Sequence, residues 1–420
     1  MTLSSPRDFL ASLFAEAVRA ADPITGIRSH LPTRPKGRTV VIGAGKGAAQ
    51  MARALESVWD GRLEGVVVTR YGYGCETRDI EIIEAAHPVP DAAGLVASQR
   101  LLAAVGDLTQ DDLVIALICG GGSALLPAPP AGMTLEDEIA VNEALLASGA
   151  PISAMNVVRK HLSTIKGGRL AASTQAQVVS LIVSDIPGDN PAHVASGPTI
   201  PDGSTRYDAI EIVEQYGLNL PQPCIDRLHS EAADAPRVDD PVFTNHRHHI
   251  VASAGVSLDA AAALAQREGV EAVILSDSIE GEARDVALVI AAIAREIEAR
   301  NRPFGKPVVL LSGGETTVTL RAKGGKGGRN GEFSLAMALA IDGHQIDVLA
   351  ADTDGIDGSE DNAGAFSDGR TVKRLRRAGL DPRRLLDSND SYSGFAAIGD
   401  LFETGPTGTN VNDFRAILVR

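Results

Sequence analysis

The chain has 420 residues, of which 44% are apolar and 22% are charged, and its formal net charge is −15. This composition excludes a disordered chain and a small disulfide scaffold, and the length is enough for two or three hydrophobic cores of about 150 residues each. An acidic chain with only 4% aromatic residues lacks the basic, aromatic surface that nucleic-acid binding requires, so we expect no nucleic-acid partner.

The N-terminal 23 residues predict an amphipathic helix with Leu10, Leu13, Phe14 and Val18 on one face, not a signal peptide. No uncharged apolar run reaches the roughly 18 residues that a membrane span needs. The three cysteines are far apart and form no C-x-x-C motif, which favours a reducing compartment. We therefore expect a cytoplasmic protein with no membrane contact.

Short Val/Ile/Leu runs alternate with helix-periodic stretches along the chain. The runs predict strands at 39–42, 65–69, 80–84, 113–118, 178–183, 249–252, 272–275, 308–311, 316–320 and 347–350. Helices are expected between most of them, including 48–59, 92–105, 135–148 and 284–300. Strands that are apolar throughout are typical of a parallel sheet buried on both faces. The sequence thus predicts an α/β fold with two α/β domains, the first Rossmann-like with a mainly parallel sheet and the second smaller with a mixed sheet.

A polar, proline-containing stretch at 230–245 predicts the linker between the two domains. We place the first domain at 1–235 and the second at 245–420. The last apolar stretch, 416–419, could return to either sheet, and a homodimer is left open.

The first glycine cluster follows the first predicted strand and contains Gly43, Gly45 and Lys46. A strand, a glycine turn and a helix N-terminus direct backbone N–H groups toward an anion. The spacing also meets a relaxed dinucleotide fingerprint, but the next strand ends in Thr69-Arg70 and not in the acid that would bind a ribose. Lys46 suits a phosphate or a carboxylate, or it is only a solvated turn lysine.

Three further clusters have similar chemistry. The second is Gly120, Gly121, Gly122 and Ser123, where the serine either caps a helix or binds a phosphate. The third is Ser312, Gly313, Gly314 and Glu315 at another strand end. The fourth, 323–330, places Lys323, Lys326 and Arg329 among four glycines, which suits a polyanion or an exposed hairpin tip.

Acidic residues follow two other strands, with Asp185 and Asp189 after one and Asp352 after the second. Mg²⁺ prefers one or two carboxylates together with phosphates and water, and Asp-Gly turns are the simpler alternative. A predicted helix places Asn156, Arg159 (or Lys160) and Ser163 on one face, for a small carboxylate or as a solvated basic face.

Several anion-binding turns, two acidic clusters and no covalent nucleophile motif indicate phosphoryl transfer. That reaction requires positioning, Mg²⁺ and cations around the transferred phosphate more than covalent chemistry by the protein.

Nine strings in order resemble the bacterial glycerate 2-kinases, a class with a C-terminal MOFRL domain. They are GAGK (43–46), HPVPD (87–91), GGGSALL (120–126), NVVRKHLSTIKGGRLA (156–171), SDIPGDNPAHVASGPTIPD (184–202), SGGETTV (312–318), GKGGRN (325–330), DTDGIDG (352–358) and TGPTGTNVND (404–413). The resemblance implies ATP-dependent phosphorylation of D-glycerate to 2-phosphoglycerate with a divalent metal, in a cleft between two α/β domains. The family's cleft lysine and arginine fall on Lys46 and Arg329. Asn190 stands where the family often has a second Asp, and Gly331 replaces its usual Gln.

Residue chemistry and the resemblance together nominate a site. Lys46 and Arg329 would neutralise the phosphate or bind the glycerate carboxylate, Asp185 would be the base, and Asp189 or Asp352 would hold Mg²⁺. Substrate or nucleotide binding is expected from the glycine clusters and from Asn156, Arg159, Lys160, Asn330 and Asn410. The alternatives are an NAD(P)-dependent hydroxypyruvate reductase, a name some family members carry, and a non-catalytic phosphometabolite-binding protein.

Overall fold

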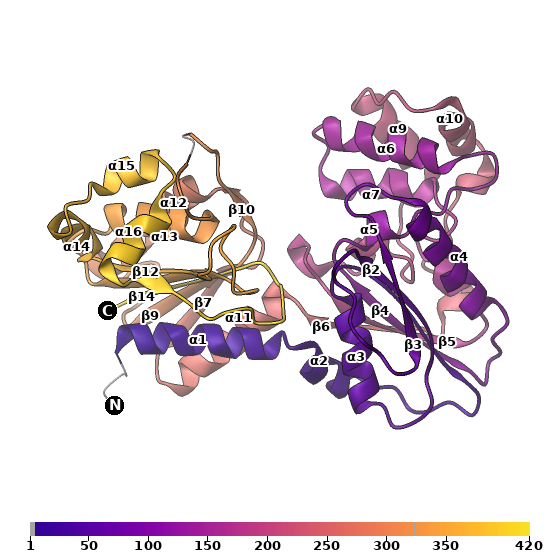
Figure 1. The fold of residues 1–420 in the computed structure, drawn as a ribbon, viewed down its shortest axis with the longest axis horizontal. Helices are drawn as coiled ribbons and strands as arrows, with labels where there is room; N and C mark the ends of the chain where they lie inside the picture. Colours follow the sequence, from indigo (N-terminus) through magenta and orange to yellow (C-terminus); the bar gives the residue numbers. More distant parts are fainter. Residues whose placement is uncertain (1–4, 322–323) are drawn as a thin grey trace. The chain divides into compact units, whose positions relative to one another are not determined.

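The computed structural model describes residues 5–321 and 324–420, which form two compact units (Figure 1). One unit comprises residues 23–251 and is called here the parallel-sheet unit. The other comprises the described part of residues 1–22 together with 252–420 and is called the mixed-sheet unit. Each unit has its own six-stranded sheet, so the predicted α/β fold with two sheets is confirmed.

The sheet of the parallel-sheet unit has the strand order β3-β2-β1-β4-β5-β6. Its strands are β1 (Thr39–Ala44), β2 (Glu64–Arg70), β3 (Ile80–Ala85), β4 (Leu113–Cys119), β5 (Gln177–Val183) and β6 (Arg247–Ala252). The pairings from β3 through β5 are all parallel. This order is the doubly wound arrangement of Rossmann-like folds, as predicted from the apolar strands.

Alternate residues of these strands enter two separate cores, because successive side chains of a strand point to opposite faces. Val40 and Ile42 pack with α4, whereas Val41 packs with α3 on the other face. The helices of the unit are α2 (Pro23–Ser29), α3 (Ala48–Val58), α4 (Ala92–Gly106), α5 (Gly122–Leu125), α6 (Leu135–Ala147), α7 (Ile152–His161), α8 (Arg169–Ala172), α9 (Arg206–Gln215) and α10 (Gln222–His229). Helices α6, α7, α9 and α10 form a third core of their own.

The sheet of the mixed-sheet unit has the order β13-β12-β11-β14-β9-β7. Its strands are β7 (Glu271–Ser276), β9 (Val308–Ser312), β11 (Ile346–Asp352), β12 (Gly364–Asp368), β13 (Leu401–Phe402) and β14 (Asp413–Val419), and β8 (Gly281–Glu282) pairs separately with β10 (Thr316–Thr317). Within the six-stranded sheet, β7 and β9 pair in parallel, and the pairings from β9 through β14, β11 and β12 to β13 are antiparallel. The separate β8–β10 pair is parallel. The C-terminal strand β14 therefore stays in this sheet, between β11 and β9.

Helices cover both faces of the mixed sheet. Helices α1 (Pro6–Ala20) and α11 (Ala254–Arg267) pack on one face, and α12 (Ala283–Arg300) and α13 (Arg329–Ala340) pack on the other. Figure 1 shows α1 lying beside α11 along the sheet. The remaining helices are α14 (Thr371–Arg377), α15 (Pro382–Asp387) and α16 (Ser391–Ile398). None of the helices in residues 5–321 and 324–420 combines the length and apolar character of a membrane span.

The division of the chain differs from the expected domains 1–235 and 245–420. The expected linker at 230–245 is part of the parallel-sheet unit, where Ala233 is buried and its carbonyl accepts a hydrogen bond from Arg169 at 2.9 Å. Strand β6 follows it into the first sheet, although we expected 249–252 in the second domain. Helix α1 belongs to the mixed-sheet unit because Leu10 and Leu13 fill the sheet face beside α11.

Candidate functional site

The first group of candidate residues lies at the carboxyl ends of β1 and β4, neighbours in the sheet at which the strand order reverses. Open α/β sheets bind their ligands at such a point. The Lys46 backbone N–H donates to the carbonyl of Gly120 at 2.9 Å, so the turns after the two strands are joined. Gly45 has φ +136°, and a Cβ there would lie 2.4 Å from the Cys119 carbonyl oxygen. The glycine is required by this close approach of the two turns.

Asp185, which follows β5, lies directly against the turn after β4. A Cβ on Gly120 would be 1.8 Å from Asp185 Oδ2, so only glycine leaves room for this carboxylate. The Lys46 side chain and the His87 ring lie against the next residue, Gly121, within 2.9–3.2 Å of the place a Cβ would take. The structure thus brings Lys46, Asp185 and two predicted glycines together.

His87 is a neighbour of this group that the sequence reasoning did not select as a site residue. Burial lowers the pKa of His87, and the positive charges of Lys46 and Arg70 lower it further. The ring is therefore neutral at pH 7 and offers one donor and one acceptor. Its place shortly after β3, in the string HPVPD, could have indicated a site residue.

Ser123 belongs to a chain of hydrogen bonds and does not cap a helix. Its hydroxyl lies 2.8 Å from the Ser196 hydroxyl, which donates to Asn156 Oδ1 at 3.0 Å. Arg159 donates to the same oxygen at 3.3 Å, and Asn156 Nδ2 donates to the His193 carbonyl at 3.2 Å. Ser196 is fully buried with φ +60°, an uncommon conformation for a serine that often marks functional sites.

The two basic candidates of α7 have different environments. Arg159 joins the Asn156 network, whereas the buried Lys160 is paired with Asp202. Burial lowers the pKa of Lys160, although Asp202 opposes this. The reading of this helix as a solvated basic face is wrong, because Asn156 and Lys160 are both buried. Ser163 lies beyond the helix end and accepts from the N–H groups of Ile165 and Lys166 at 3.2 and 3.3 Å.

Asp189 lies in a short turn after β5 with φ +50° and is partly exposed. Within the described ranges, no side chain or backbone N–H contacts its carboxylate. Such an unengaged carboxylate is available to a cation.

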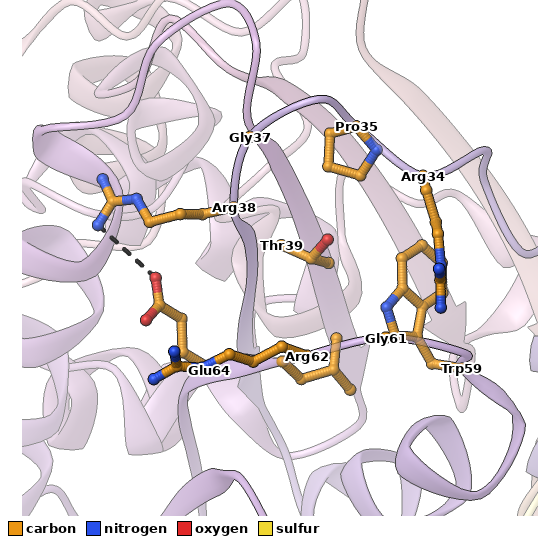
Figure 2. A pocket seen from close by; sticks show the side chains of 10 residues that line it. Arg34, Pro35, Gly37, Arg38, Thr39, Trp59, Gly61, Arg62 and Glu64 are labelled. Carbon is orange, nitrogen blue, oxygen red and sulfur yellow. Dashed lines mark ion pairs between the residues drawn. The ribbon is translucent and has the colours of Figure 1, made fainter.

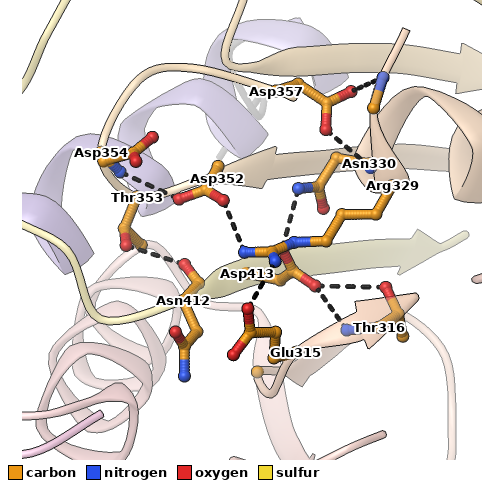
Figure 3. A network of polar contacts seen from close by, with 12 residues as sticks. Glu315, Thr316, Arg329, Asn330, Asp352, Thr353, Asp354, Asp357, Asn412 and Asp413 are labelled. Atoms are coloured by element: carbon orange, nitrogen blue, oxygen red, sulfur yellow. Dashed lines mark hydrogen bonds and ion pairs between the residues drawn. The ribbon is translucent and has the colours of Figure 1, made fainter. Parts of the chain in front are cut away.

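The second group of candidate residues surrounds Arg329, the first residue of α13 in the mixed-sheet unit (Figure 3). Its guanidinium donates to Asp413 at 2.6 Å, to Asp352 at 2.7 Å and to Glu315 at 2.8 Å. Burial disfavours the charge of Arg329, but the three carboxylates raise its pKa above the ordinary value. Arg329 is therefore always charged, and its charge is already balanced by acids.

Asp413 links Arg329 to a second, fully buried arginine. Arg415 pairs with Asp413 and donates to the Thr316 hydroxyl at 2.9 Å and to the Gly313 carbonyl at 3.2 Å. The sequence reasoning missed both residues as site residues. Asp413 is the last residue of the string TGPTGTNVND and the first residue of β14, and its place in that string could have indicated a site residue.

Asp352 ends β11 and is almost fully buried beside other acids. Burial raises the pKa of Asp352 above the ordinary value; the Arg329 guanidinium opposes this shift, and Asp354 and Asp413 add to it. The expected acidic cluster at the end of this strand thus forms.

The backbone at the start of α13 is bound by Asp357, which stands in for a helix cap. Its carboxylate accepts from the N–H groups of Asn330 at 2.9 Å, Gly331 at 2.7 Å and Gly328 at 3.2 Å. A Cβ on Gly331 would lie 2.5 Å from the Ser391 hydroxyl, so this position leaves no room for a side chain. Asn330 itself donates to Asp413 at 2.9 Å.

The third glycine cluster lies at the end of β9 and contributes to the same group. Ser312 is buried, and Gly314 has φ +110° with a Cβ position only 2.2 Å from the Ile279 nitrogen. Glu315 is exposed, and Asn410 is exposed and donates to Asp354 at 3.5 Å. Of the fourth cluster, Lys323 lies outside the described residues.

Whether Mg²⁺ fits this protein depends on how its carboxylates are arranged. Across residues 5–321 and 324–420, no three His, Cys, Asp or Glu side chains are grouped so as to hold a metal ion. Mg²⁺ in kinases commonly takes only one or two carboxylates, with phosphates and water completing its shell. Asp189 or Asp352 could supply such a carboxylate. Among the described residues, neither is part of a site in which protein side chains alone would hold the ion.

Two family models, several relatives and solved structures match this chain. Residues 9–229 match a family described as a domain of unknown function, DUF4147, and residues 308–413 match the MOFRL family. A glycerate 2-kinase of Pyrococcus horikoshii is 41% identical, covering 98% of this chain and 97% of its own. The crystal structure of a glycerate kinase of Thermotoga maritima has a TM-score of 0.89 and 38% identity, covering 99% of this chain and all of its own. An Agrobacterium vitis protein with the provisional name hydroxypyruvate reductase is 50% identical, covering 99% of this chain and 95% of its own.

Proposed function

Because the chain belongs to the glycerate 2-kinase family, we propose that it transfers the γ-phosphoryl group of ATP to the 2-hydroxyl of D-glycerate. The observation that carries the proposal is that Asp185 lies against Gly120 and Lys46 against Gly121, in the turn after β4 at the switch point of the parallel sheet. A cation for the phosphate and a base for the hydroxyl are the two groups that this transfer needs from a protein.

In the proposed reaction, Asp185 accepts the proton of the glycerate hydroxyl as that oxygen forms its bond to the γ-phosphorus. The bond from this phosphorus to the β–γ bridging oxygen breaks, and ADP leaves. Lys46 stabilises the negative charge on the transferring oxygens. Its side chain is exposed, so it is accessible to a substrate.

We assign Ser123 the role of accepting a hydrogen bond from a glycerate hydroxyl. Asn156 uses its Nδ2 group on a carbonyl, so its Oδ1 faces Ser196, and the Ser196 proton is directed to it. The Ser123 proton is therefore the one shared with Ser196, and the outer lone pair of Ser123 is free for a donor. A hydroxyl offers such a donor, whereas a fully ionised phosphate does not.

Arg329 would neutralise the transferring phosphate or bind the glycerate carboxylate, and we propose either role. Three of its five N–H donors are occupied by carboxylates, which leaves two for a substrate. The Glu315 contact is the exposed one and the easiest to replace. Lys46 and Arg329 belong to different units, and their meeting at one substrate stays a prediction.

Mg²⁺ would be held by Asp189 or Asp352 together with the phosphates of ATP. When bound, it neutralises charge on the phosphate oxygens. Asp189 is proposed because its carboxylate is unengaged, and Asp352 because one of its oxygens carries only the Asp354 N–H, at 3.2 Å.

The test is an assay of ADP release with D-glycerate and ATP, followed by identification of the phosphorylated position. We expect 2-phosphoglycerate. Lys46→Ala should lower kcat by about 100-fold or more, since a positioned charge on the transferring group is lost. Its far-UV circular dichroism should be unchanged, because the side chain is exposed. Product phosphorylated at position 3, or near-normal turnover of Lys46→Ala, would contradict the proposal.

A hydroxypyruvate reductase is the second candidate, since a close relative carries that name. The site argues against it: β2 ends in Arg70, where a dinucleotide site places an acid for the ribose. Loss of NADH absorbance with hydroxypyruvate would support the reductase. A protein that only binds phosphometabolites would give neither NADH oxidation nor ADP release.

A further inference from the structure

A cavity of about 370 Å³ opens in the parallel-sheet unit at the amino ends of β1 and β2 (Figure 2). Thr39, the first residue of β1, lines it, whereas the Lys46 turn follows the other end of that strand. The cavity is therefore separated from the proposed catalytic group by the length of β1, about 20 Å at 3.3 Å per residue. Its volume lies within the range of small-molecule sites.

The cavity is positively charged although the chain as a whole is strongly acidic. Arg34, Arg38 and Arg62 line it together with a single acid, Glu64. Across the described parts of the chain, no carboxylate or carbonyl is bonded to the Arg62 guanidinium. Arg34 pairs with Asp60, whose side chain is fully exposed, and exposed pairs contribute little free energy. Arg38 pairs with Glu64 at 3.6 Å and with Asp107 at 3.2 Å, and these side chains are also exposed. Three guanidinium groups thus line one space, two of them in exposed ion pairs and Arg62 without one among the described residues.

The backbone of the loop that carries Arg38 is held in place by the carboxylate of Asp112. Asp112 accepts from the Arg38 N–H at 2.6 Å and from the Thr109 N–H at 2.8 Å. A Cβ on Gly37 would lie 2.3 Å from the same carboxylate. Because the backbone is held in this way, the cavity wall is formed before any ligand binds, which lowers the entropy cost of binding.

A second glycine positions Arg34. Gly61 has φ +150°, and its missing Cβ would lie 3.0–3.2 Å from three atoms of the Arg34 guanidinium. The guanidinium therefore packs over the Gly61 backbone, on the side of the cavity where Figure 2 shows Trp59.

One wall of the cavity is flat and apolar. Trp59 lines it with the 8% of its surface that is exposed, and Pro35 and Leu63 lie nearby. Figure 2 shows the indole on the side opposite the Arg38–Glu64 ion pair, which spans 3.6 Å. A ligand could thus contact a planar ring at one end and guanidinium groups at the other.

We propose that this cavity is a binding site for a phosphate monoester that carries a flat apolar group. Guanidinium groups bind phosphate oxygens through paired, charge-assisted hydrogen bonds, and an indole stacks on flat rings. The site is independent of the proposed kinase reaction, because it uses neither Lys46 nor Arg329.

The chain itself supplies the reporter, since Trp59 is its only tryptophan. Trp59 emission of the full-length protein is followed during titration with phenyl phosphate and, separately, with inorganic phosphate, at constant ionic strength. We expect a saturable change with phenyl phosphate, and weaker binding of inorganic phosphate, which lacks the flat group. Calorimetric titration of the same samples detects binding that leaves the emission unchanged.

Three variants locate the binding. Arg62→Gln should weaken phenyl phosphate binding about tenfold, because one charge-assisted contact is lost and no internal partner is disturbed. Arg100→Gln removes an equal charge from α4, outside the cavity, and should bind like the wild type. Lys46→Ala should also bind like the wild type.

Three results would overturn the proposal, and a fourth would overturn only the role of the apolar wall. Equal affinity in Arg62→Gln and the wild type, loss of the response in Lys46→Ala, or no saturable binding by either method would overturn the proposal. Inorganic phosphate that binds as tightly as phenyl phosphate would overturn the role assigned to the apolar wall.

Discussion

Replacement of Asp413 by asparagine tests the buried charge network of the mixed-sheet unit. The substitution keeps the size of the side chain but removes the charge that lies between Arg329 and Arg415. Arg415 is fully buried, and Asp413 supports its charge against the effect of burial, which lowers its pKa. The variant therefore removes the carboxylate that forms the ion pair with this buried guanidinium.

The expected loss follows from that burial. Breaking a buried ion pair by removing one partner costs about 3–5 kcal/mol. In a unit of this size each kcal/mol lowers the melting temperature by about 2–4 °C, so we expect a decrease of roughly 6–20 °C. The hydrogen bonds of Thr316 to Asp413, both 3.2 Å, are weakened as well and place the loss toward the upper end.

Thermal unfolding by far-UV circular dichroism measures the effect. Glu315→Gln is the matched control: it removes another carboxylate from Arg329, but that side chain is 58% exposed and should contribute at most about 1 kcal/mol. Trp59 emission reports the other unit and should show an unchanged transition. A shift in Asp413→Asn no larger than that in Glu315→Gln would refute the reasoning.

Three other results are expected. Gly120→Ala should displace the Asp185 carboxylate and lower kcat by about 100-fold. Gly106→Ala is the control: its added Cβ meets open space, so kcat in the same assay should be unchanged. Ser196→Ala removes the centre of a hydrogen-bond chain and should raise the KM for glycerate more than the KM for ATP; equal changes would argue against its role. The denaturant midpoint measured by Trp59 emission should fall as the pH is lowered through 6.5. Burial lowers the pKa of five histidines of the parallel-sheet unit, so the unfolded chain binds more protons than the folded chain and the free energy of unfolding decreases. A midpoint that does not change with pH would contradict this. These histidines are His87, His161, His193, His246 and His249.

Most strands were predictable because their sequence signal is local. The run that became β4 is apolar throughout and those that became β1 and β11 are mostly apolar, as strands buried on both faces require. Strand β12 was not predicted, since its short sequence GAFSD has no such run, and 318–320 were predicted as strand but follow the end of β10. The glycine turn before Lys46 was also readable, because strand, turn and helix are adjacent in the chain.

The sequence by itself determined most of the strands, several of the helices, and which turns carry cations, acids and glycines, since each depends on neighbouring residues. Only the tertiary structure decided that Asp185 lies against Gly120, that Asp413 joins Arg329, and that α1 packs with the C-terminal residues. These contacts connect residues tens to hundreds of positions apart. They depend on which strands become neighbours and which sheet face is left to cover, and no local pattern of residue types encodes either choice.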